Sequence, residues 1–429
     1  MFEQMRWPAW GKHRKWLVLL GLTLVAYVAA MNRAQAFFWL VPALLTATLL
    51  TGYFWPRWLV RRLEVARQGP SRAQEGAVVQ FEVQVHNPGR LPRFMVELID
   101  HLPFTGLSVG TLPKGAPQWL GMVNHLPGRR TLSFQVQVPC EKRGFYTLGP
   151  VGLASSFPLG LSEARVLSGH SRQTLTVYPD VFSVLHLPLR GAPSQIHRGG
   201  YQLPEGSGAA EFSGLREYRR GDNPRHIHWP TTARLSELMV REFEPLASAC
   251  LFLLLDQTQA ANVGVGRHTT FEYAVRIAAS LARTACEKGI RTRLAGSGSG
   301  AMGGVAAFGN VHYQQLLDAL AVVDSRAEQT YGAWLAELAP SGLRGETAVV
   351  FLSSTRTNWP DTLQALAVLS ARGMHLWAVV FDVPSFSPAG DVVRNVYADP
   401  QQMNAELLAL GAHVVNVRRG DDLVKVFNP

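Results

Sequence analysis

The first sixty residues carry two long apolar runs joined by a short polar link. Residues 16–31 and 36–55 are almost entirely apolar, and the four residues between them read Asn-Arg-Ala-Gln. A helix of about twenty residues crosses a hydrocarbon core of ~30 Å, so the second run is long enough to span a bilayer. Because four residues cannot cross back, the pattern predicts a helical hairpin in a membrane.

Two other interpretations of these runs stay open. A cleaved signal peptide would also show a basic start, an apolar stretch and small residues such as Ala34 and Ala36. It would leave residues 37–55 as a single span with three arginines soon after it. A pair of buried core helices is disfavoured, because nothing before residue 60 could cover them.

From about Leu63 to Pro179 the pattern changes to short strands and turns. The stretch "AVVQFEVQVHNPG" alternates apolar and polar positions and ends on turn residues, and "RFMVELID" and "TLSFQVQVP" repeat the theme. No helix-length periodicity interrupts it. The pattern predicts an antiparallel β-sandwich of immunoglobulin-like kind, serving as a spacer or docking module.

After Ser248 buried strands alternate with helices. "ACLFLLLD" (249–256) is a continuous apolar run, and residues 271–289 have helical spacing that ends at a glycine. The same alternation continues to the last predicted strand at 412–417. Strands that are apolar on both faces, separated by helices, predict a parallel, doubly wound α/β sheet. The predicted domains are 1–62 (cytoplasmic N-terminus and membrane hairpin), 63–190 (β-sandwich), 191–248 (linker and charged segment) and 249–429 (α/β).

Charge and cysteine usage indicate the compartment. The chain has a net charge of +10, with 47% hydrophobic and 17% charged residues, which excludes a disordered protein. The link between the apolar runs holds only Arg33. The flanking cations are Arg6, Lys12, Arg14 and Lys15 before the runs, and Arg57, Arg61, Arg62 and Arg67 after them. By the positive-inside rule both ends face the cytoplasm. Three scattered cysteines, without CxxC spacing, are typical of buried thiols in a reducing compartment (Cys140, Cys250 and Cys286).

Few motifs in the α/β part suggest chemistry. "GSGAMG" (298–303) satisfies GxGxxG, but a strand and turn follow it where a nucleotide-binding helix would begin, so it predicts a hairpin-like loop. No phosphate-binding GxxxxGK[ST] occurs. Asp256 and Thr258 end the first α/β strand, where ligands gather in such sheets. Their hard oxygens could hold magnesium, but Ala260 supplies no hydroxyl, so the predicted metal site is degenerate.

The segment 211–244 is the most heavily charged part of the chain. It holds six arginines, no lysine and six acidic residues. Guanidinium groups suit paired carboxylates, and a phosphate-binding patch would show excess positive charge. The balance therefore predicts an ordered ion network at a contact surface, in which buried pairs specify geometry more than they stabilise. An alternative is an active site using Asp222, His226 and His228, although no nucleophile accompanies them.

The same segment resembles the signature of the domain-of-unknown-function-58 family of bacterial proteins. The matching positions are Glu211, Phe212, Leu215, Arg216, Tyr218, Gly221, Asp222, Arg225, Ile227, Trp229, Ala233, Arg234, Leu238, Val240, Arg241 and Glu242. The resemblance also covers "RGFYTLGP", "FPLGL", the apolar runs and the α/β part. It implies a membrane-anchored relative of the von Willebrand factor A fold, commonly encoded beside MoxR-type AAA ATPases and transglutaminase-like membrane proteins. The metal motif of that fold is Asp-x-Ser-x-Ser, from which this chain departs at Thr258 and Ala260.

These patterns lead to one main hypothesis and two alternatives. The protein is expected to be a non-enzymatic adaptor or assembly factor at the bacterial inner membrane, mostly cytoplasmic, with a MoxR-type AAA ATPase and other membrane proteins as partners. The interaction residues are Arg216, Tyr218, Gly221, Asp222, Arg225, His226, His228, Trp229, Arg234, Arg241 and Glu242. The alternatives are a hydrolase-like enzyme and a module for anionic lipid or nucleic acid. Nucleic acid is not the expected partner, because much of the excess charge lies beside the apolar runs, where lipid accounts for it.

Overall fold

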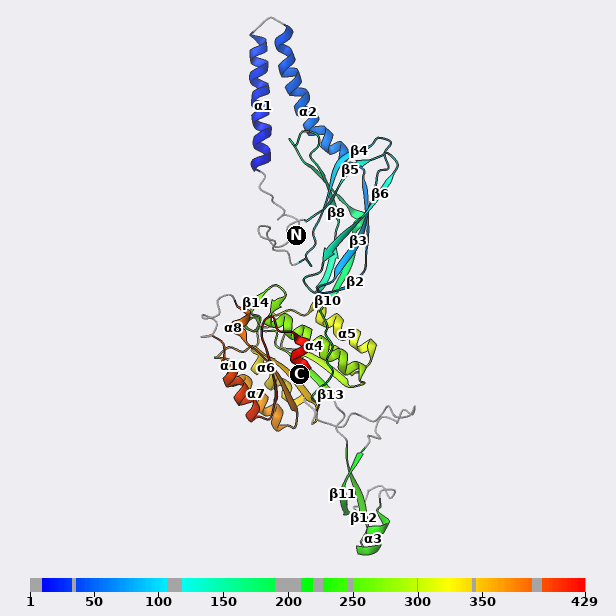
Figure 1. Ribbon diagram of the computed structural model, residues 1–429, viewed down its shortest axis with the longest axis vertical. Coiled ribbons are helices and arrows are strands. Elements are labelled where there is room, and N and C mark those ends of the chain that lie inside the picture. Colours follow the sequence, from blue (N-terminus) through cyan, green and yellow to red (C-terminus); the bar gives the residue numbers. More distant parts are fainter. Residues whose placement is uncertain are drawn as a thin grey trace. The chain divides into compact units, whose positions relative to one another are not determined.

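The computed structural model describes residues 10–32, 36–105, 118–189, 210–218, 227–235, 237–245, 250–298, 300–341, 345–387 and 396–428. The chain forms two compact units, Met1–Tyr178 and Pro179–Pro429 (Figure 1). The division lies upstream of the predicted boundary at residue 190. Residues 182 and 184 explain it, because their backbones bond the hydroxyls of Ser280 and Thr284 in the second unit.

Two helices begin the first unit, α1 (Trp10–Met31) and α2 (Leu40–Val60), with a short 3₁₀ turn before α2. The helices lie side by side and antiparallel, because Tyr27 meets Thr46 with 3.0 Å between their hydroxyl oxygens while the earlier Trp16 contacts the later Tyr53 at 5.9 Å between ring centres. Among the described residues one helical stretch, Phe37–Val60, is long and apolar enough to cross a membrane. A second apolar helical stretch, 15–31, is shorter, so a two-span hairpin stays a prediction.

Three sheets form the β-rich region, residues 64–178. Their strands are β1 (Glu64–Gln68), β3 (Val78–His86) and β6 (Thr131–Pro139) in one sheet; β5 (Gln118–Leu126), β4 (Arg93–Asp100), β8 (Val151–Ser155) and β9 (Ala164–Ser168) in another; and β2 (Arg72–Gln74), β10 (Gln173–Tyr178) and β7 (Gly144–Leu148) in the third. All pairings are antiparallel except β10 with β2, which is a parallel exception to the predicted antiparallel pattern.

The core of this region follows from the period-two pattern. The alternating apolar positions of β3 from Val79 to Val85 are buried as predicted, and the polar positions between them are not; Val78 at the start of the strand is exposed. Val83 and Val85 of β3 share one hydrophobic cluster with Val96 and Leu98 of β4, so these two sheets pack face to face. The last residue of α2, Val60, belongs to the same cluster, which fixes the end of the helix to the β-rich region.

One ion pair is buried inside the β-rich region. Arg67 on β1 donates to the carboxylate of Asp100 on β4, and both side chains are 1% exposed. Arg67 also donates to the carbonyl of Ser171 at 3.0 Å, and the His101 amide donates to Asp100 at 2.8 Å. Burial raises the pKa of Asp100, against the opposing effects of Arg67 and of the His101 amide. The pair therefore fixes the relation of two strands at a considerable cost in desolvation.

The α/β region, residues 250–428, is built on a six-stranded sheet. Its strand order is β17 (Gly300–Ala307), β16 (Arg291–Gly296), β13 (Cys250–Leu255), β18 (Thr347–Leu352), β19 (His375–Phe381) and β20 (His413–Val417). The helices are α4 (Thr270–Glu287), α5 (Asn310–Val322), α6 (Tyr331–Leu338), α7 (Trp359–Ala371), α8 (Val383–Phe386), α10 (Pro400–Ala409) and α11 (Leu423–Phe427). A two-residue pair, β14 (Gly264–Val265) and β15 (His268–Thr269), precedes α4. All six residues of β13 and of β18 are buried, as continuous apolar runs predict.

One strand departs from the predicted all-parallel sheet. β17 runs antiparallel to β16, and Gly296 pairs with Gly300 across a tight connection. The connection is too short for a crossover helix, which a parallel pair requires. The glycine-rich stretch around residues 298–303 thus forms the hairpin that its sequence predicted.

Candidate functional site

The signature segment forms a separate two-stranded sheet. β11 (Ala210–Glu217) pairs antiparallel with β12 (Met239–Pro245), with an irregularity in register between Phe212 and Gly214. A short helix, α3 (Trp229–Leu235), follows β11 and precedes β12 (Figure 1). The alternating apolar positions after Leu238 predicted the second strand, and Pro230 at the start of α3 has the fixed φ that a first helical turn accepts.

The structure places only part of the predicted interaction set. Tyr218 donates its backbone N–H to Leu238 at 2.8 Å, which extends the pairing of β11 and β12 by one step. Arg216, Arg241 and Glu242 lie on the paired strands, but their side chains are outside the described part. Four further predicted residues lie outside the described residues altogether: Gly221, Asp222, Arg225 and His226. The predicted ion network therefore stays a prediction.

His228 holds the start of α3. Its carbonyl accepts from the amides of Thr231 and Thr232, at 3.2 and 3.1 Å, and its Nδ1 lies 2.8 Å from the Thr231 hydroxyl. Its own amide donates to Met239 at 2.8 Å. These bonds satisfy backbone groups that a helix end leaves free. They give His228 a structural role at the turn.

The helix and the residue before β12 present apolar side chains to solvent. Trp229, Leu235 and Leu238 are 63%, 56% and 44% exposed, and α3 buries none of its residues. We call these three residues the apolar tip surface. Arg234 on the same helix is also exposed. Tryptophan and arginine are residue types that protein interfaces favour.

The second candidate location is the carboxyl edge of the six-stranded sheet, where β13 ends at Asp256. This side chain is 5% exposed, and its Oδ1 accepts from the amide and hydroxyl of Thr258, at 2.9 and 2.7 Å. Burial raises the pKa of Asp256 to about 6, although both bonds from Thr258 oppose the rise. Ionising a buried carboxylate costs folding stability, so such a residue is a candidate for a functional role.

The residues around Asp256 do not fit a magnesium ion. Thr258 already donates its hydroxyl to the carboxylate, and Ala260 has no oxygen on its side chain. Directly after the neighbouring strand β18, the Ser353 hydroxyl donates to the Ala261 carbonyl at 2.9 Å. Within the described ranges no three His, Cys, Asp or Glu side chains gather in a way that could hold a metal. A hard cation requires more oxygen ligands than this edge supplies.

Gln257 organises the loops beside this edge. Its Oε1 accepts from the Gly298 amide at 2.7 Å, and its Nε2 donates to the Asp324 carbonyl at 3.1 Å. A Cβ on Gly296 would lie 2.5 Å from the same Oε1, so a larger residue there would have to displace the Gln257 amide. A pocket of about 560 Å³ opens next to these loops, lined by Gln257, Ser297, Gly298, Val322, Val323, Asp324, Arg326, Ala327, Glu328 and Gln329. The side chain of Asp256 is not part of its lining.

The three cysteines are buried thiols, as their spacing predicted. Burial raises the pKa of Cys140 to about 11 and, together with the nearby Glu346, that of Cys250 to about 12. Burial also raises the pKa of Cys286. A thiol with a raised pKa is a poor nucleophile at neutral pH. These residues serve packing.

Comparison with known proteins identifies the central segment. Residues 214–382 match the family described as "Protein of unknown function DUF58". The predicted family resemblance is confirmed over these residues, whereas the relationship to the von Willebrand factor A fold stays a prediction. The DUF58 match begins in β11 and extends through the α/β region to the end of β19. It therefore contains both the apolar tip surface and Asp256.

A curated bacterial protein shares part of this sequence. The chain is 32% identical over 108 residues to the "Uncharacterized protein YeaD" of Bacillus subtilis (strain 168), which is 25% of each protein. The chain thus matches about a quarter of the length of that DUF58 relative.

Solved structures resemble the chain over short stretches. The CARDB domain of the PF1109 protein from Pyrococcus furiosus, in complex with di-metal ions, is 14% identical, with 27% of this chain and 91% of that chain covered and a TM-score of 0.18. The alkylpurine DNA glycosylase AlkC of Pseudomonas fluorescens, bound to DNA containing an abasic site analog, is 9% identical, with 30% and 33% covered and a TM-score of 0.20.

Proposed function

We propose that this protein is a membrane-anchored, non-enzymatic adaptor that binds a partner protein through the apolar tip surface. The observation that carries the proposal is the exposure of Trp229, Leu235 and Leu238 on and beside one short helix. Several exposed apolar side chains within one ten-residue segment favour a protein contact, whereas single ones need no explanation. The DUF58 match places this turn inside the family segment.

The proposed partner is an AAA ATPase of the MoxR type. The family resemblance supports this partner, because proteins of this kind are commonly encoded beside such ATPases. The apolar tip surface, together with the exposed Arg234, suits binding to a groove on a folded protein. We further propose that the α/β region is related to the von Willebrand factor A fold. An open, mostly parallel sheet with helices on both faces supports that relationship.

Anchoring at the bacterial inner membrane is part of the same proposal. The helical stretch Phe37–Val60 supports it by length and composition, and cations follow it at Arg61 and Arg62. In the proposed orientation, α1 and α2 form a membrane hairpin and the rest of the chain is cytoplasmic. The alternative of a hydrolase gains no support from the described residues, since His228 is engaged in holding α3.

Replacing Trp229 with Ala is expected to weaken partner binding by ~2 kcal/mol, roughly thirtyfold, because a central tryptophan dominates such interfaces. Binding of full-length protein in detergent to the purified ATPase measures this directly. Trp119→Ala is the matched control, since Trp119 on β5 is 64% exposed but lies in the first unit. Equal affinities of the two variants for the ATPase would refute the proposed surface.

A further inference from the structure

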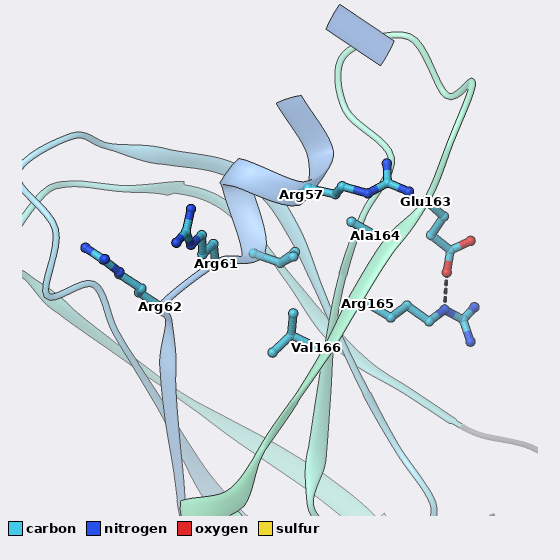
Figure 2. A pocket seen from close by; sticks show the side chains of 8 residues that line it. Arg57, Arg61, Arg62, Glu163, Ala164, Arg165 and Val166 are labelled. Carbon is cyan, nitrogen blue, oxygen red and sulfur yellow. Dashed lines mark hydrogen bonds and ion pairs between the residues drawn. The ribbon is translucent and has the colours of Figure 1, made fainter. Parts of the chain in front are cut away.

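A pocket lies where α2 meets the β-rich region. Its volume is about 340 Å³, within the range of small-ligand sites. Figure 2 shows that one wall comes from the end of α2 and the residues after it, and the other from β9 and the residue before it. The lining residues are Arg57, Val60, Arg61, Arg62, Glu163, Ala164, Arg165 and Val166.

The sequence of α2 places this pocket at a membrane surface. Tyr53, Phe54 and Trp55 are exposed near the end of the helix, and the arginines follow directly. Exposed aromatic residues followed by cations are the usual order at the cytoplasmic boundary of a span. The loop before β9 also touches the helix at this level, since the Ser162 hydroxyl donates to the Gly52 carbonyl at 2.5 Å.

The pocket is strongly cationic. Its lining holds four arginines and one carboxylate, Glu163, which is paired with Arg165. Arg57 donates to the Tyr53 carbonyl at 2.6 Å. Arg61 and Arg62 are exposed, and in the part of the chain that the structure describes neither has a carboxylate partner. In Figure 2 the labelled arginines lie on both walls and their guanidinium groups point in different directions, with that of Arg165 beside Glu163. This arrangement suits a phosphate group with several oxygens, because each guanidinium offers a planar fork of donors.

The backbone that carries these arginines is held in place. Arg93 on β4 is largely buried and donates from Nη1 to the Trp58 carbonyl at 2.6 Å and from Nη2 to the Arg61 carbonyl at 3.5 Å. Its guanidinium also lies 3.9 Å from the centre of the Trp58 ring. The helix then ends, and Arg62 takes a positive φ of 61°. A fixed helix end makes the pocket a built feature of the fold.

We propose that this pocket binds the phosphate-bearing headgroup of an anionic phospholipid in the cytoplasmic leaflet. The inference rests on the proposed membrane anchoring and adds a specific lipid contact to it. Anionic headgroups attract juxtamembrane cations. A pocket with two walls can in addition select one kind of headgroup, which unselective attraction to a charged surface cannot do. Free inorganic phosphate offers the same chemistry, but it would not be concentrated at the end of a membrane span.

The test uses the full-length protein in detergent with mixed phosphatidylglycerol and phosphatidylcholine, and native mass spectrometry counts the retained lipid. Wild type is expected to retain phosphatidylglycerol preferentially. The double variant Arg61→Gln/Arg62→Gln is expected to lose about tenfold or more of that preference. Arg165→Gln, from the opposite wall, is expected to weaken it as well. Inorganic phosphate in excess distinguishes the two sources of the anion, and displacement of the lipid at low phosphate concentration would overturn the lipid assignment.

The matched control is Arg129→Gln/Arg130→Gln. These residues are also adjacent and exposed, one of them has a positive φ of 59°, and neither lines the pocket. If this variant retains phosphatidylglycerol and Arg61→Gln/Arg62→Gln does not, the result supports lipid binding in the pocket. An equal loss in both would overturn it in favour of diffuse charge. Flotation of each variant with phosphatidylcholine vesicles tests anchoring separately, because failure of wild type to float would refute the anchor and not the pocket chemistry.

Discussion

Asp100→Ala is expected to destabilise the β-rich region by ~3–5 kcal/mol, because it leaves the Arg67 guanidinium buried without its carboxylate. Both side chains are almost fully inaccessible, so water cannot replace the lost partner. The Ser171 carbonyl still accepts from Arg67, but it carries no full charge. The loss should therefore approach the upper end of the range for single substitutions.

Hydrogen–deuterium exchange of β1, β3 and β4 in the full-length protein measures this loss. Arg165→Ala is the matched control in the same unit, since its pair with Glu163 is partly exposed, and we expect less than ~1 kcal/mol there. Replacing both buried partners, as in Arg67→Met/Asp100→Leu, is expected to restore much of the stability. If Asp100→Ala costs no more than Arg165→Ala, the pair is not a determinant of this core.

Asp256→Asn is expected to stabilise the α/β region at neutral pH. Burial raises the pKa of this carboxyl from 3.8 to about 6, which corresponds to ~3 kcal/mol between the protonated and the ionised forms. An amide keeps the oxygen that accepts from Thr258 and removes the buried charge. The gain in the free energy of unfolding should be on the order of 3 kcal/mol above pH 6.

The sign of the pH dependence follows from the direction of this shift. Well below pH 3.8 the carboxyl is protonated in both the folded and the unfolded chain, so Asp256 and its amide variant should have similar stability. Between about pH 4 and pH 6 the unfolded chain releases its proton first, and the wild type loses stability as the pH rises. The variant should lack this loss.

Denaturant unfolding of the full-length protein at pH 4 and at pH 7.5 measures both effects. Thr258→Val is the control of opposite sign, because it removes the hydroxyl donor that supports the carboxylate and should destabilise at pH 7.5. A variant Asp256→Asn that is less stable than wild type at pH 7.5 would show that the carboxylate is needed by the fold. A variant that is more stable but no longer binds the ATPase would assign Asp256 to function.

Much of the fold is readable from local sequence patterns. Period-two alternation located β3, and the continuous apolar runs located the buried strands β13 and β18. These patterns succeed because burial on one or both faces dictates them residue by residue. The antiparallel course of β17 was not predicted, since the hairpin is apparent from its glycines but the direction of an edge strand is set by connection length.

Contacts between distant residues were beyond sequence reasoning. Arg67 and Asp100 belong to different strands, and Arg93 reaches the end of a helix more than thirty residues earlier. Nothing in their neighbouring residues marks these arginines as buried. The same limit applies to the pocket at the end of α2, because Arg57 and Arg165 come together only when β9 is placed beside the helix. The positive charge after the apolar run was the one feature of the sequence that pointed to this pocket.

The fixed end of α2 has a mechanical consequence. Val60 is part of the β-rich core, and Arg93 binds the carbonyls of Trp58 and Arg61, so only three residues, Arg61, Arg62 and the buried Leu63, separate α2 from β1. Such a junction has no hinge. A force applied to the β-rich region is therefore transmitted along the axis of α2. A change in the tilt of α2 rotates the β-rich region by the same angle.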